Sequence, residues 1–244
     1  MIGSEGVPAR ELPRAPIIPD NSQPYPPRLW SRREVAVMPV LPDFKVSGDE
    51  GSYCVGANAT FGTGVAGPNA AAFSATSAVM SFLNKNGTGG PRTYLDYIRL
   101  ILTAIPTAGT RFDIGITLDT VARATAGTVV SMVNPNIDSV QQGPNTQVLY
   151  TPTVAAAGGN VRQAARATLK VGAPVVGDEY LLVFGTVEKS SSLIASTTIA
   201  GRYVVPLPPI IIGGGGFQTA LIHLWSVTSS AAPSFEFEVG LLER

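Results

Sequence analysis

The chain has 244 residues, of which 45% are hydrophobic and only 14% are charged, well below the usual quarter. This composition excludes a disordered chain, and the balance of 17 Lys and Arg against 17 Asp and Glu excludes a protein that coats nucleic acid. With 26 glycines and 20 prolines, the chain favours short strands joined by turns over long helices.

Residues 1–45 are predicted to form an extended, proline-rich arm. Nine of the 20 prolines fall by Pro42, and proline fixes φ and lacks an N–H, which excludes a helix or a central strand. A disordered tail is the alternative, but a solvated tail has little use for so many apolar side chains. We expect the aromatic and leucine side chains to fill pockets of a neighbouring subunit and the arginines to pair with carboxylates. The predicted contact residues are Tyr25, Arg28, Leu29, Trp30, Arg32 and Arg33.

Residues 46–244 are predicted to form one all-β domain, an antiparallel β-sandwich or jelly roll. Short alternating segments recur between turns rich in Gly, Pro and Asn, and no repeat of fixed period occurs. The predicted strands are 52–61, 93–106, 110–120, 128–133, 147–152, 164–171, 179–186, 201–207, 219–227 and 234–241.

Four local features follow from the pattern inside this domain. In 110–120 the alternation places Arg111, Asp113, Gly115 and Thr117 on one face, opposite an apolar face. Pro106–Gly109 is predicted to join 93–106 and 110–120 as a hairpin. In 93–106 a strict alternation places Tyr94, Asp96, Ile98 and Leu100 on one face. One helix is expected, over 70–86, ending at Asn86-Gly87.

The glycine run Gly213–Gly216 is the one segment that resembles a phosphate loop. A dinucleotide fingerprint would need a glycine at position 218 or 219, and a P-loop would need Lys and Ser or Thr after the run. The chain has Gln218 and Thr219 there. We therefore expect a flexible connection between two antiparallel strands and no nucleotide or other cofactor.

No catalytic constellation emerges from the remaining polar residues. His223 is the only histidine and lies on a predicted strand beside Trp225, where a packed or interface role is expected. Glu236 and Glu238 lie on one strand face at a spacing a glycosidase could use, but the ion-paired face of an edge strand is the favoured interpretation. The single Cys54 excludes an intramolecular disulfide and a Cys-rich zinc site, and is expected to be buried. The sequence predicts no enzyme and no metal site.

The C-terminal strands and the low charge predict an oligomer. A surface so poor in charge is expected to be buried against partners, and a homotrimer is the predicted state. The predicted interface residues are Trp225, Phe235, Phe237, Leu241 and Leu242. The N-terminus has no apolar core of signal-peptide length and no run reaches 18 apolar residues, so we expect no secretion signal and no membrane partner.

Three stretches of the second half resemble virion structural proteins of tailed bacteriophages, chiefly short-tailed ones. They are "VNPNIDSVQQGPNTQVLY" (133–150), "APVVGDEYLLVFG" (173–185) and the segment from Phe217 to Arg244. The resemblance implies a jelly-roll-like protein that cements or decorates the capsid surface, made in the host cytoplasm, with the major capsid protein and its own copies as partners. It transfers no catalytic residue. A receptor- or glycan-binding module of a tail or head fibre is the alternative, and a carbohydrate-active enzyme would rest on Glu236 and Glu238 alone.

Overall fold

The computed structural model describes residues 51–106, 111–138, 143–185, 200–227 and 229–244, and these contain strands and turns but no helix. The predicted arm, residues 1–45, lies outside the described residues. The strands are β1 (Tyr53–Ala57), β2 (Val65–Ala66), β3 (Met80–Asn84), β4 (Thr93–Ala104), β5 (Arg111–Asp119), β6 (Ala124–Val130), β7 (Met132–Val133), β8 (Gln147–Val154), β9 (Arg162–Val171), β10 (Glu179–Phe184), β11 (Arg202–Leu207), β12 (Ile211–Ile212), β13 (Gln218–Ser226) and β14 (Ser234–Glu243).

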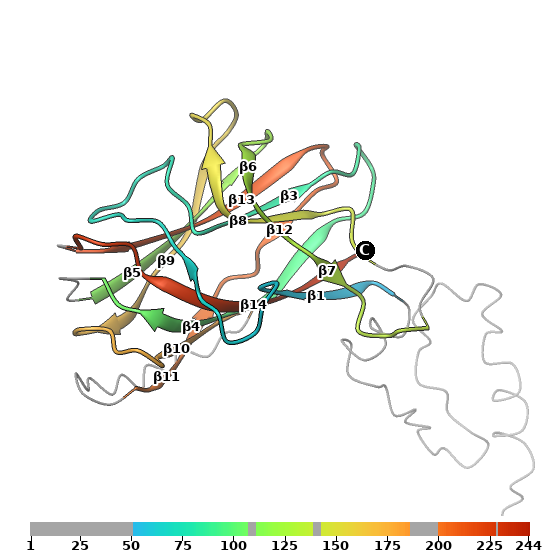
Figure 1. Ribbon diagram of the computed structural model, residues 1–244. Helices are drawn as coiled ribbons and strands as arrows, with labels where there is room; N and C mark the ends of the chain where they lie inside the picture. Colours follow the sequence, from blue (N-terminus) through green and yellow to red (C-terminus); the bar gives the residue numbers. More distant parts are fainter. Residues whose placement is uncertain (1–50, 107–110, 139–142, 186–199, 228) are drawn as a thin grey trace, which may run out of the picture. The chain divides into compact units, whose positions relative to one another are not determined.

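The strands form two stacked sheets, which confirms the predicted all-β sandwich (Figure 1). One sheet has the order β11-β10-β4-β14-β1-β7, with β12 beside β4 and β2 beside β14; the other has the order β6-β8-β3-β13-β5-β9. The pairing is antiparallel except between β10 and β11, which run parallel. Pro206 lies in β11 at the edge of its sheet, where the missing N–H costs no ladder hydrogen bond on the open side.

The hydrophobic core lies between the two sheets, and aromatic side chains from both of them meet in it. Phe112 of β5 contacts Phe235 of β14 and Tyr180 of β10, with ring centroids 5.9 Å apart in each pair. Tyr150 of β8 stacks on Phe237 of β14 at 4.5 Å. Because all five side chains are almost fully buried and come from opposite sheets, these contacts tie the layers together.

The helix expected over 70–86 does not form. Residues 70–79 are largely turn and loop, and β3 follows, paired with β8 on one side and β13 on the other. All five residues of β3 are buried, the polar Ser81 and Asn84 included, so polar and apolar residues do not alternate along it. A short segment without alternation does not distinguish a strand buried on both faces from a helix, and here the two neighbouring strands decide the outcome.

Two of the connections cross between the sheets. β4 pairs with β10, β12 and β14, whereas β5 pairs with β9 and β13, so the predicted hairpin at 106–109 is wrong. The glycine run also leads from β12 in one sheet to β13 in the other. Gly213, Gly214 and Gly216 have positive φ, and a Cβ on Gly213 would lie 2.6 Å from the Asn84 side-chain amide. The run is therefore a crossing that needs glycine for backbone conformation and for close approach.

A bulge in β4 corrects the predicted faces of that strand. Gly240 of β14 pairs with Tyr97 and the next residue pairs with Leu95, so Asp96 has no opposite partner. The bulge lets both Leu95 and Ile98 point into the core. Strict alternation predicts that Tyr94 and Asp96 share a face with Ile98. They do not, because the extra residue of the bulge shifts the period by one.

A buried ion pair closes the end of the core near β9 and β10. Lys170 Nζ lies 2.7 Å from Asp178 Oδ2, and both side chains are essentially inaccessible to solvent. The Asp178 carboxylate also accepts hydrogen bonds from the Val175 and Gly201 amides and from the Tyr180 hydroxyl. Full satisfaction by hydrogen bonds is the condition under which a buried pair is tolerated.

Lys170→Met is expected to lower the free energy of unfolding by about 3–5 kcal/mol, because it leaves the Asp178 carboxylate buried without a counter-charge. Adding Asp178→Asn should recover part of the loss, since the remaining group is neutral. Urea denaturation followed by tryptophan fluorescence measures both variants. Lys85→Met, at an exposed position, is the control; a Lys170→Met protein as stable as this control would show that the pair is not needed.

Candidate functional site

The outer face of β5 forms the floor of the candidate site. Alternation along β5 directs Arg111, Asp113, Gly115 and Thr117 away from the core, as the sequence predicts. β13 and β9 flank β5, and the three strands are in register, so that Gly115 lies between His223 of β13 and Arg166 of β9. Gly115 has no side chain, and the floor is therefore open at that position.

Trp225 uses the space that Gly115 leaves. A Cβ on Gly115 would lie 3.2 Å from Cζ3 and 3.4 Å from Cη2 of the indole, closer than most carbon contacts. The indole of Trp225 therefore leans from β13 across β5. On the β9 side, Cζ of Arg166 lies 5.8 Å from the centroid of the indole, within the range of a cation–π contact.

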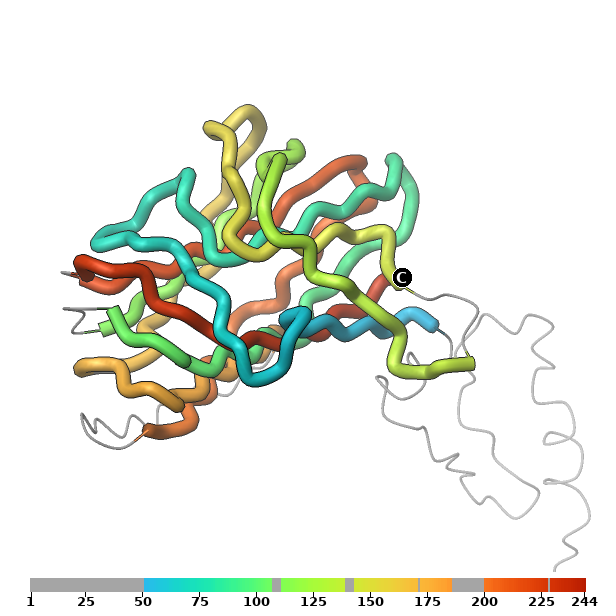
Figure 2. The backbone as a smooth tube through the Cα atoms, viewed as in Figure 1, coloured from blue at the N-terminus to red at the C-terminus, as the bar shows by residue number. Residues whose placement is uncertain are grey.

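Phe73, from the segment between β2 and β3, forms the wall on the β13 side. This segment runs from one sheet to the other (Figure 2). The ring of Phe73 makes edge contacts with His223 at 5.0 Å and with Trp225 at 5.6 Å. Phe73 remains partly exposed, whereas His223 and Trp225 are buried. Its ring therefore presents apolar surface to solvent from a position that two buried rings support.

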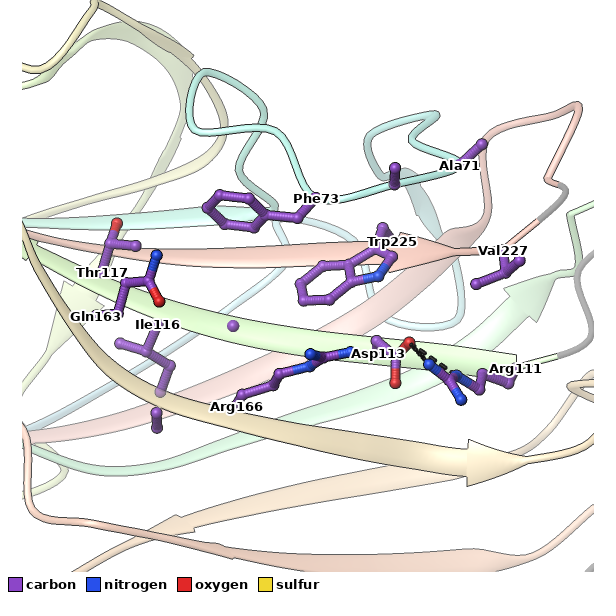
Figure 3. A pocket seen from close by; sticks show the side chains of 13 residues that line it. Ala71, Phe73, Arg111, Asp113, Ile116, Thr117, Gln163, Arg166, Trp225 and Val227 are labelled. Atoms are coloured by element: carbon purple, nitrogen blue, oxygen red, sulfur yellow. Dashed lines mark hydrogen bonds and ion pairs between the residues drawn. The ribbon is translucent and has the colours of Figure 1, made fainter.

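Together these residues line an open cavity of about 530 Å³ over the outer face of β5, which we call the β5 trough. Figure 3 shows Phe73 and Arg166 on opposite sides of Trp225. The larger side chains that line it include Phe73, Arg111, Thr117, Gln163, Arg166 and Trp225. The volume lies within the roughly 300–1,000 Å³ typical of small-ligand sites, and the lining combines aromatic rings with a few polar groups.

The charges that line the trough do not balance. Asp113 is its single carboxylate: Oδ2 accepts from Arg111 at 2.8 Å, and Oδ1 accepts from the Thr168 hydroxyl at 2.7 Å. Among the described residues, no carboxylate lies within ion-pair distance of Arg166. The trough thus carries two guanidinium groups against one carboxylate, and one guanidinium is left uncompensated.

His223 fixes the loop that carries Phe73. Its Nδ1 lies 2.8 Å from the Ser77 carbonyl oxygen, which only accepts, so Nδ1 carries the proton. Nε2 then accepts from the Thr117 hydroxyl at 2.9 Å. Burial lowers the pKa of His223 below its ordinary value, which keeps the ring neutral. His223 is therefore a packed, hydrogen-bonded residue, as expected from the sequence.

Three of the five predicted interface residues lie in the core of the single chain, and the other two are covered in part by the chain itself. Phe235, Phe237 and Leu241 are buried in the core between the sheets, and Trp225 is covered by Phe73 and Arg166. Leu242 is half-buried. Their apolar character is explained by the fold without a partner, so these residues give no support for a trimer, which stays a prediction. The arm residues Tyr25, Arg28, Leu29, Trp30, Arg32 and Arg33 lie outside the described residues, and their roles also stay predictions.

The carboxylates Glu236 and Glu238 are engaged in structural contacts. Glu238 lies 3.6 Å from Arg99 and accepts a hydrogen bond from the Tyr97 hydroxyl, and Glu236 accepts from the Gly62 amide at 3.0 Å. This is the ion-paired face that the sequence predicts. The prediction that this strand lies at the edge of a sheet is wrong, because β14 lies between β4 and β1 in the interior of its sheet.

Three further observations concern the described part of the chain. Burial raises the pKa of the Cys54 thiol to about 11, which keeps it protonated at neutral pH. Within the described ranges no group of three or more His, Cys, Asp or Glu side chains is placed to hold a metal ion. A search of the same residues for a helix long and apolar enough to cross a membrane finds none.

The sequence predicts that the four floor residues of the β5 trough share one strand face, but it predicts neither a site there nor its walls. Phe73 falls within the predicted helix at 70–86, and Gln163 and Arg166 are not among the predicted site residues. The signal for the last two is the alternation of β9, whose alanines and leucine at 165, 167 and 169 face the core. No local signal in the sequence places Phe73 over β13.

Comparison of the chain with protein-family models, with curated proteins and with solved structures finds no match. The structure defines the chain as a two-sheet β-sandwich with a ligand-sized cavity on one outer face.

Protonation of His223 is expected to destabilise the fold. Its folded-state pKa is lowered, so the unfolded chain, with a His pKa of about 6.5, binds the proton more readily. The stabilisation is complete above that value and is lost as the pH falls below it. Between pH 7.5 and 5.5 the free energy of unfolding should fall by about 1 kcal/mol more in the wild type than in His223→Gln.

Urea denaturation of both proteins at the two pH values measures this difference. Because the chain has one histidine, the variant removes the entire histidine contribution. An equal pH dependence in the two proteins would exclude His223 as the source.

Proposed function

We propose that this chain is a virion structural protein of a tailed bacteriophage that binds and stabilises the assembled capsid lattice, and that it acts without catalysis. Three features support the proposal: the strand order of the sandwich, the low charge of the chain, and the resemblance of 133–150, 173–185 and 217–244 to phage virion proteins. The strand order is the observation that carries it.

The strand order supports a jelly roll, the finer form of the sandwich. In an eight-stranded jelly roll, the first strand pairs with the eighth, the eighth with the third and the third with the sixth; the other sheet joins the second, seventh, fourth and fifth. If β1, β3, β4, β5, β9, β10, β13 and β14 are taken as the eight strands, the sheets contain β1-β14-β4-β10 and β3-β13-β5-β9. β6, β7 and β8 are then an insertion between the fourth and fifth strands. Jelly rolls serve as viral capsid and lectin domains.

The proposed mechanism is thermodynamic. A protein that binds only the assembled lattice stabilises it by mass action, and many symmetric copies add avidity. In this proposal the arm, residues 1–45, is the fastener, because its prolines restrict the free chain and so reduce the entropy lost on docking. Tyr25, Leu29 and Trp30 would fill pockets, and the arginines would pair with carboxylates of the capsid protein or of a sister subunit.

A receptor- or glycan-binding module is the second candidate, and one observation favours it. The β5 trough has the size and the mixed aromatic and polar lining of a small-ligand site. Jelly rolls include lectins, so the same strand order is compatible with this candidate. The two candidates differ in where binding occurs: on the arm for the capsid, and in the trough for a glycan.

A protein truncated to begin at Val46 is expected to stay folded and to bind particles poorly. Co-sedimentation with capsids lacking the protein measures occupancy, and circular dichroism checks the fold. Trp30→Ala should weaken attachment by a few kcal/mol at most, as for a single hot spot. Phe61→Ala, at an exposed position within the domain, is the control. Full occupancy by the truncated protein would show that the arm is not the fastener, and no binding by the full chain would reject the capsid role.

Light scattering of the free protein tests the predicted homotrimer separately. A stable species of 25.4 kDa at micromolar concentration would contradict it, because that is the mass of one chain.

A further inference from the structure

We propose that the β5 trough binds a saccharide that carries a carboxylate, such as a uronic acid. The inference deepens the second candidate function, on which it rests, and is independent of capsid binding by the arm. It is carried by three properties of the trough: its aromatic wall, its hydrogen-bonding groups and its uncompensated guanidinium.

The aromatic wall suits the apolar face of a pyranose ring. Aromatic rings carry negative charge on their faces, and the axial C–H groups of a sugar ring carry partial positive charge. Phe73 is 42% exposed at the rim, whereas Trp225 is 8% exposed deeper in the trough. The contacts with His223 and Trp225 hold the Phe73 ring in place, so docking a sugar against it costs little additional ordering.

The polar groups of the trough supply both donors and an acceptor, as a polyhydroxylated ring requires. Gln163 lines the trough with an amide that donates through nitrogen and accepts through oxygen. The Thr117 hydroxyl donates to His223 Nε2, so its oxygen remains an acceptor for a ligand hydroxyl. Thr117 of β5 lies opposite Gln163 of β9 in the sheet, which places the two side chains side by side.

Arg166 determines the preference for an acid. Its guanidinium has no carboxylate within ion-pair distance among the described residues, and the one carboxylate that lines the trough, Asp113, is already bound to Arg111 and Thr168. A planar guanidinium binds a carboxylate through two parallel hydrogen bonds, which are stronger than those to a neutral hydroxyl. A ligand carboxylate would therefore provide the charge that the protein leaves unmatched.

The test is a titration of the full chain with methyl glucuronide and with the methyl ester of the same sugar. The two ligands have nearly the same shape but differ in charge. Trp30→Phe removes the second tryptophan and leaves Trp225 as the reporter of the trough. We expect the acid to bind at least about tenfold more tightly than the ester, as the loss of one charged hydrogen bond predicts. Isothermal titration calorimetry checks each affinity without relying on fluorescence.

Three variants, made in the same background, locate the site. Arg166→Gln should remove the preference for the acid, and Phe73→Ala should weaken the acid and the ester alike. Arg162→Gln is the matched control, because Arg162 is an exposed arginine of the same strand that does not line the trough. Circular dichroism and thermal unfolding check that each variant is folded.

The outcomes separate this inference from the proposed functions. Equal binding of acid and ester would overturn the acidic preference but leave the glycan-binding candidate in place. Equal losses in Arg166→Gln and Arg162→Gln would overturn the site. Absence of binding by either ligand at millimolar concentration would overturn the inference and remove the support for the glycan-binding candidate. None of these results bears on capsid binding, which the co-sedimentation experiment tests separately.

Discussion

The contacts of Phe112 with Phe235 and Tyr180 join the two sheets, and the direction of the side chains in the β5 trough follows from them. Side chains alternate along a strand, so a strand whose Phe112 points into the core must direct Arg111 and Asp113 outward. β9 and β13 pair with β5 and share its layer, which gives the trough its two sides. The site is therefore built on strands packed on a core, and only the wall that carries Phe73 comes from a loop.

Buried polar groups hold the ends of the sandwich. Glu243, at the end of β14, accepts hydrogen bonds from Asn86, Thr146 and the Asn145 amide, which brings three separate segments together. The Lys170–Asp178 pair does the same near β9 and β10. Because leaving such a group unpaired in a buried position is costly, these networks specify one arrangement of the connecting segments.

The two outer faces of the sandwich differ in how their charges are matched. On the eight-stranded sheet, Arg202, Glu179, Arg99 and Glu238 come from four neighbouring strands and form a continuous row of ion pairs. On the six-stranded sheet, Arg166 lies beside an open cavity without such a partner among the described residues. Exposed ion pairs contribute little stability, but each charge in such a pair already has an opposite charge beside it. The face with the unmatched charge is consequently the one on which a ligand is proposed.

The sequence by itself determined the fold class and nine of the strands that the structure contains, because alternation with period two is a local signal. The tenth predicted strand, 128–133, covers the end of β6 and all of β7. The sequence also determined that Arg111, Asp113, Gly115 and Thr117 share a face, since that follows from the same period. Where alternation is absent or interrupted, prediction failed: polar and apolar residues do not alternate along β3, and the bulge at Asp96 shifts the faces of β4.

Only the tertiary structure decided which strands are neighbours and what lies opposite each outer face. Pairing between β5 and β13 joins residues about a hundred positions apart, and no local pattern specifies it. The same holds for Trp225 over Gly115 and for Phe73 against His223, which depend on the packing of a loop on a sheet. The apolar residues at 235, 237 and 241 illustrate the limit: apolar character predicts burial, but the core of the chain rather than a partner buries them.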